Sequence, residues 1–87
     1  EVFFFVLEFE KREMRLCQMV ITSKTPFVDK TLKDSGIRDR YNCMVVGLEE
    51  GNENLSNVSP NYRFKEGDII WIVGEEEAVT SIMNPRS

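Results

Sequence analysis

The chain has 87 residues, enough for one small domain with a small core, so a dimer interface or an attached neighbour would help to stabilise it. Its 11 Lys and Arg against 15 Asp and Glu give a net charge of -4, without the positive excess that nucleic-acid binding needs. With 2 Cys and no His, the sequence argues against structural zinc and against Ser-His-Asp or Cys-His catalysis. We therefore expect no enzyme, no metal site, no cofactor and no nucleic-acid partner.

The first ten residues, EVFFFVLEFE, place apolar side chains at every second position and predict a strand. Residues 14–22 are apolar and partly β-branched, which predicts a second strand covered on much of both faces. The helix-forming composition of EFEKREMRLCQ leaves a helix over 7–18 as the alternative. We assign 1–13 to an N-terminal strand and connection to an upstream part. Phe3–Phe5 would be exposed in a monomer, so we expect them to be buried against that part or a partner.

The segment SKTPFVDKTLKDSGI predicts a short helix. Thr25 can cap its start, and Pro26 suits the first helical position because its missing N–H is not needed there. Gly36 can adopt the left-handed conformation that ends a helix, with Ile37 folding back toward Leu32.

The second half of the chain predicts three strands and a terminal helix. Residues 42–49 indicate a buried strand, EEGNEN a polar turn, and Leu55 the start of a return strand. A loop with Pro60 leads to an apolar strand over 69–73, and the acidic start of EEEAVTSIM begins the helix. Trp71 within that strand is expected in the core or at a dimer interface. The fold class is therefore α+β, a small four- to five-stranded, mainly antiparallel sheet with two short helices.

With these elements in place, the run from about Leu16 to Met83 resembles the TrkA C-terminal domain, also called the C-terminal domain of the regulator of potassium conductance (RCK). The resemblance rests on the succession of KTL, GIRDRY, SP and EGDIIWIVG. It assigns residues 14–87 to a TrkA-C regulatory domain. The family often has Gly before Lys-Thr-Leu, whereas this chain has Asp29, for which we expect an ordinary right-handed conformation.

The resemblance implies a ligand-sensing and dimerisation domain that regulates a membrane potassium channel, potassium transporter or cation:proton antiporter. Such a domain would lie at the cytoplasmic face of the membrane, covalently linked to or associated with the transporter, and would act as a homodimer. The alternative is the small-ligand sensor domain of a soluble regulator with the same fold.

The resemblance also implies a nucleotide ligand such as cyclic di-AMP. In family members that bind it, the Arg of the Ile-Arg turn meets the phosphates and the loop Pro lies near the bases. These positions are Ile37, Arg38 and Pro60 here, and we predict them as the ligand-binding residues. A base-reading Asn of those members is Met44 here, which cannot donate to a base edge.

Two other interpretations of the charged residues stay open. Arg38 and its neighbours Asp39 and Arg40 could form a solvated charged turn with no ligand. A catalytic domain could use Asp29, Asp34 or Asp68 as a general base, which would require a carboxyl group held in a closed pocket.

Overall fold

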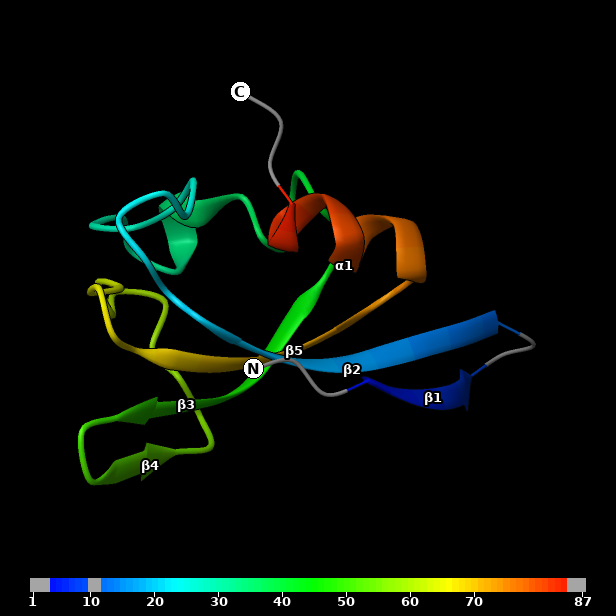
Figure 1. Ribbon diagram of the computed structural model, residues 1–87, viewed down its shortest axis with the longest axis horizontal. Helices are drawn as coiled ribbons and strands as arrows, with labels where there is room; N and C mark the ends of the chain where they lie inside the picture. The colour runs from blue at the N-terminus through cyan, green and yellow to red at the C-terminus, as the bar shows by residue number, and fades with distance from the viewer. Residues whose placement is uncertain (1–3, 10–11, 85–87) are drawn as a thin grey trace.

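The computed structural model describes residues 4–9 and 12–84. It contains one five-stranded sheet with the strand order β1-β2-β5-β3-β4, in which all neighbouring strands are antiparallel (Figure 1). The elements are β1 (Phe4–Phe9), β2 (Arg12–Val20), a 3-10 helix (Lys33–Ser35), β3 (Met44–Glu50), β4 (Glu53–Leu55), β5 (Ile69–Gly74) and α1 (Glu76–Met83). The predicted α+β class, with four to five strands and two short helices, is confirmed.

The N-terminal segment forms strands, and the alternative of a helix over 7–18 is wrong. Leu7 pairs with Met14 and Phe5 with Leu16, so the helix-forming residues alternate along two bonded strands. The favourable helix propensity of Glu, Lys and Arg is overridden because β2 also bonds to β5 along its other edge. The predicted boundary between residues 13 and 14 falls within β2 and stays a prediction. Phe3 lies outside the described residues.

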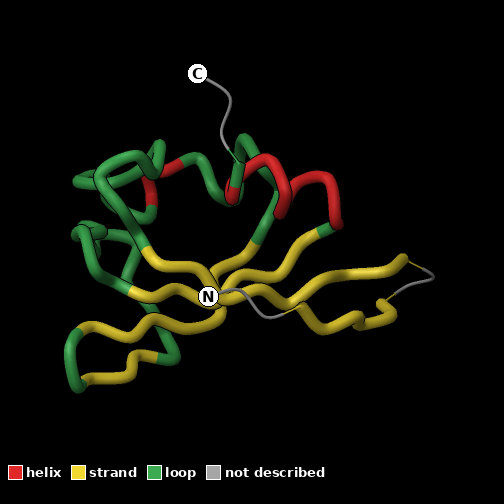
Figure 2. Tube along the Cα trace, in the orientation of Figure 1, coloured by secondary structure: helices red, strands yellow, loops and turns green. Residues whose placement is uncertain are grey.

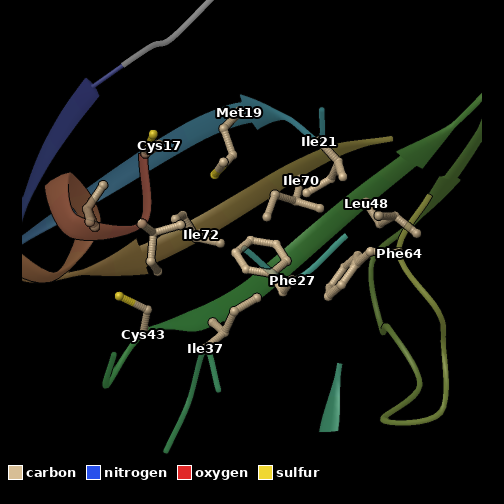
Figure 3. Packing of buried hydrophobic residues seen from close by; sticks show 12 residues of the cluster. Cys17, Met19, Ile21, Phe27, Ile37, Cys43, Leu48, Phe64, Ile70 and Ile72 are labelled. Atoms are coloured by element: carbon tan, nitrogen blue, oxygen red, sulfur yellow. The ribbon is translucent and has the colours of Figure 1, made fainter. Parts of the chain in front are cut away.

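One face of the sheet is covered by α1 and by the loops that connect β2 to β3 and β4 to β5 (Figure 2). Ile70 and Ile72 of β5 are completely buried between these layers. The Phe27 and Phe64 rings pack edge to face, with centroids 5.3 Å apart, as loop contributions to the same core (Figure 3). The buried hydrophobic residues are Cys17, Met19, Ile21, Phe27, Ile37, Cys43, Leu48, Phe64, Ile70, Ile72, Val79 and Ile82.

The opposite face has no second layer within the described residues, so the prediction that β2 is covered on much of both faces is wrong. Val20 at the end of β2 is 40% exposed. Trp71 lies on this face and outside the core, and its Nε1 donates to Glu49 Oε2 at 2.9 Å. Gln18 Nε2 donates to the same oxygen at 3.2 Å. Whether Trp71 contributes to a dimer interface stays a prediction.

The helix predicted after Thr25 is replaced by turns and the 3-10 helix. Thr25 does not cap a helix, because its Oγ1 accepts a hydrogen bond from the N–H of Thr22 at 2.8 Å. Asp29 has φ 66°, so the expectation of a right-handed conformation is wrong. Its N–H donates across the fold to Phe64 O at 2.9 Å, and the side chain of Arg63 donates to its carbonyl. Hydrogen bonds to the distant residues 63 and 64 of the same chain therefore occupy the backbone groups of Asp29 that a helix would use. Asp also tolerates the left-handed region better than most residues do.

The ends of the remaining elements follow the turn residues. Gly36 adopts φ 81° and closes the 3-10 helix, as predicted. Gly51 at φ 58° makes the β3-β4 turn so short that β4 ends at Leu55, where the return strand was predicted to begin. The terminal helix is confirmed, with Val79 and Ile82 buried. Within residues 4–9 and 12–84, no helix has the length and hydrophobicity needed to cross a bilayer.

We predict that Gly74→Ala destabilises the fold by about 1–3 kcal/mol, because the added methyl would overlap with Cys43 Sγ in the core. Gly47→Ala is the matched control, since its methyl would meet Trp71 at an ordinary 3.5 Å. Urea unfolding measures both. A Gly74→Ala variant as stable as Gly47→Ala would show that β5 does not pack tightly against Cys43.

Candidate ligand pocket

A surface pocket of about 610 Å³ lies where the loop after the 3-10 helix, the start of β3 and the loop before β5 meet. Ile37, Arg38 and Pro60 all line it, so the structure brings the three sequence-predicted residues together. That they bind a ligand stays a prediction. The lining residues are Leu32, Lys33, Ile37, Arg38, Asp39, Cys43, Met44, Val45, Val58 and Pro60.

One wall of the pocket is formed by two segments that bond to each other in antiparallel fashion. Lys33 N–H donates to Pro60 O at 2.9 Å, and Leu32 N–H donates to Tyr62 O at 2.8 Å. A bridge between Thr31 and Arg63 continues the same pairing. The position of Pro60 is therefore coupled to that of Lys33 through the backbone.

The second wall is a tight turn that carries Ile37 and Arg38. The Ser35 hydroxyl donates to Leu32 O at 2.7 Å and accepts from Ile37 N–H at 3.1 Å. Cys43 N–H then donates to Ile37 O at 2.8 Å, which closes the turn onto the start of β3. Because Ile37 is 1% exposed, its side chain anchors the turn in the core and leaves the adjacent Arg38 at the surface.

The pocket rim carries two cations, Lys33 and Arg38, and one carboxylate, Asp39. Within residues 13–84, neither cation forms an ion pair with a carboxylate. Arg40 differs from Arg38, because its guanidinium lies over the Tyr41 ring at 5.7 Å and it does not line the pocket. The interpretation as a solvated charged turn therefore fits Arg40 better than Arg38.

The pocket floor contains one thiol, that of Cys43. Burial raises the pKa of this thiol to about 11, with a further contribution from Cys17. The thiol is thus protonated at neutral pH and is a poor nucleophile there. Together with Leu32, Met44, Val45 and Val58 it makes the uncharged part of the pocket lining apolar.

The three candidate general bases do not share a pocket. Asp29 and Asp34 are exposed. Asp68 is 4% exposed, and its Oδ2 accepts from Tyr62 Oη at 2.7 Å and from Lys65 N–H at 2.9 Å. Burial and then the hydrogen bond to Asp68 raise the pKa of Tyr62. Asp68 therefore holds the loop before β5 in place. The described part of the chain also offers no group of three or more Cys, Asp or Glu side chains arranged to hold a metal ion.

Sequence reasoning missed Lys33 as a pocket residue, and also the apolar floor residues Val45 and Val58. Lys33 lies within the segment for which a short helix was predicted, and no role was assigned to it there. The signal that could have found it is the pairing of its segment with the Pro60 loop. Such pairing is not visible in local sequence.

Comparison with known proteins places this geometry in a family. The family model of the TrkA-C domain matches residues 16–85. This chain belongs to the TrkA-C domain family. The sequence resemblance drawn from KTL, GIRDRY, SP and EGDIIWIVG is confirmed.

Two curated relatives contain a similar segment. An uncharacterized transporter of Synechocystis is 29% identical over 77 residues, which cover 88% of this chain and 13% of the relative. A probable potassium channel protein of Methanocaldococcus jannaschii is 30% identical over 77 residues, covering 88% of this chain and 22% of the channel. The chain thus spans less than a quarter of the length of either relative.

Two solved structures share the fold of this TrkA-C domain. The RCK C domain of the potassium transport protein KtrA in complex with cyclic di-AMP has a TM-score of 0.68 and 22% identity, covering 75% of this chain and 74% of that one. The RCK C domain dimer of S. agalactiae BusR in complex with cyclic di-AMP has a TM-score of 0.64 and 18% identity, covering 76% of this chain and 80% of that one.

We predict that stability falls as the pH rises from about 9 to about 11. The unfolded thiol of Cys43 loses its proton near 9, whereas the folded one keeps it to about 11, so the unfolded state binds fewer protons over this range. The contribution is at most about 1.4 kcal/mol per pH unit. Urea unfolding at several pH values measures it. Cys43→Ala should show a shallower decline, although Cys17 and Tyr62 contribute in the same direction; an unchanged slope would contradict the assignment.

Proposed function

We propose that this TrkA-C domain is the ligand-sensing and dimerisation module of a membrane cation transporter, channel or antiporter, placed at the cytoplasmic face of the membrane. The observation that carries the proposal is the pocket in which Ile37, Arg38 and Pro60 meet. The two curated relatives support the link to transport, one being a transporter and the other a probable potassium channel. No catalytic role is proposed, because the pocket offers neither a nucleophile activated by a base nor a buried carboxylate.

The ligand proposed for the pocket is a nucleotide such as cyclic di-AMP. The pocket volume of about 610 Å³ is in the range of small-molecule sites. Arg38 can bind a phosphate through its planar guanidinium, while Val58 and Pro60 offer apolar surface to a base. The similar fold of the KtrA domain solved with cyclic di-AMP supports this choice. Met44 offers no hydrogen-bond donor, so adenine would be held here by packing instead of by an amide contact.

Regulation would act through the way in which two copies pack. A ligand can shift such an equilibrium only by the difference between its affinities for the two arrangements. Met44 is 63% exposed at the border of the pocket, which leaves an apolar surface that a second copy would cover. A ligand held between this border and Arg38 would then contact both copies and favour one arrangement over another.

The alternative is the sensor domain of a soluble regulator. One observation favours it, because the BusR neighbour has also been solved in complex with its promoter DNA. Any DNA contact would have to come from another part of such a protein, since this chain has a net charge of -4. Membrane spans in the same protein would support the transporter module, whereas a DNA-binding domain in the same protein would support the soluble regulator.

We predict that the chain is a dimer in sedimentation or light-scattering measurements and that Met44→Glu weakens it, because a charge would be placed on the proposed contact. Ser23→Glu, at an exposed position that does not line the pocket, is the control. A chain that is strictly monomeric at high concentration would contradict the dimer.

We predict that Arg38→Ala lowers the affinity for cyclic di-AMP about tenfold or more, because it removes a charge-assisted hydrogen bond to phosphate. Arg40→Ala is the matched control, since Arg40 lies over Tyr41 outside the pocket. Isothermal titration calorimetry measures both. Equal affinities of the two variants for cyclic di-AMP would show that Arg38 does not bind the ligand.

A further inference from the structure

The pocket lining consists of charged side chains and apolar side chains, the thiol of Cys43 being counted with the apolar ones. Its uncharged members are apolar side chains or a protonated thiol, and none is an amide or a hydroxyl. Amides and hydroxyls are the side chains that distinguish one uncharged polar group from another. The directional polar contacts available from lining side chains are therefore those of Lys33, Arg38 and Asp39.

The two cations lie on successive turns of one continuous stretch, and each turn has its own hydrogen bonds to another part of the fold. Lys33 stands on the segment whose backbone bonds to Pro60, with its N–H donating to Pro60 O at 2.9 Å. Arg38 follows Ile37, whose N–H is held by Ser35 and whose carbonyl is held by Cys43. The two walls therefore each bring one cation to the same 610 Å³ space.

The net charge of the pocket rim is positive, whereas that of the whole chain is negative. The rim holds two cations against the single carboxylate of Asp39, whereas the chain carries -4. Lys33 and Arg38 have no carboxylate partner within residues 13–84, in contrast to Lys65, which pairs with Glu50, and Arg15, which pairs with Glu76. An anion in the pocket would therefore meet two cations that are not already paired with a carboxylate of this part of the chain.

We propose that Lys33 is a second anion-binding residue of this pocket, acting with Arg38 on one phosphate group, so that the site selects its ligand by phosphate charge. This inference rests on the proposed function, since it concerns the same pocket. The compact ammonium of Lys33 supplies charge on a flexible stem, whereas the Arg38 guanidinium supplies a fixed pair of donors. Because charge carries the recognition, affinity must fall steeply with salt.

The test compares Lys33→Met with Lys30→Met, a change of an exposed lysine that does not line the pocket. Calorimetry with cyclic di-AMP at about 50 and about 200 mM salt should show that Lys33→Met loses about tenfold in affinity at the lower salt and depends less on salt than the wild type. Lys33→Arg should retain most of the affinity. Equal unfolding midpoints for the two methionine variants ensure that the loss is not one of folding.

A second probe, inorganic pyrophosphate, separates this inference from the proposed ligand. In NMR titrations of the wild type, pyrophosphate should shift the side-chain signals of Lys33 and Arg38 together and leave those of Lys30 unchanged. If cyclic di-AMP does not bind while pyrophosphate does so through Lys33, the dinucleotide is wrong and the two-cation site stands. If Lys33→Met binds both probes as Lys30→Met does, or if neither probe perturbs Lys33, the inference is overturned.

Discussion

Strand β5 is bonded along both of its edges, to β2 on one side and to β3 on the other. Its core-facing residues Ile70 and Ile72 are fully buried, so the strand cannot move without opening the core. The start of β3, which forms the pocket floor, is held by the pairing of Met44 with Val73 and of Val45 with Ile72. The geometry of the pocket is thus set by the centre of the sheet, although its charged rim stands on loops.

The long loops acquire their shape by bonding to each other. Segment 29–33 and segment 60–64 form an antiparallel pair that includes bonds from Asp29 to Phe64 and from Lys33 to Pro60. The left-handed conformation of Asp29 costs local stability and is offset by these bonds and by the packing of Phe27 against Phe64. A ligand that moved the Pro60 loop would therefore also move the Lys33 segment.

Much of the fold could be predicted because alternation and turn residues are local signals. The continuous apolar run over 69–73 identified β5, and Gly36 identified the left-handed end of the 3-10 helix. The helix after Pro26 was predicted wrongly because its competitor, the pairing with segment 60–64, joins residues about thirty positions apart. Local propensity cannot register such bonds. The same limit applies to the pocket: Ile37, Arg38 and Pro60 were found through the family resemblance, whereas Lys33 enters only once the two segments are paired.

Trp71, whose indole is hydrogen-bonded to Glu49, is an intrinsic fluorescent probe of this chain. Trp71 is the single tryptophan, it stands on the uncovered face of the sheet, and it does not line the ligand pocket. Its indole is only partly shielded from solvent and lies beside a carboxylate, so its fluorescence reports the polarity at this one place. Covering of the face by another surface would change that emission, whereas events confined to the pocket would leave it alone. Covering of this one face of the sheet can therefore be followed separately from ligand binding, and without any added dye.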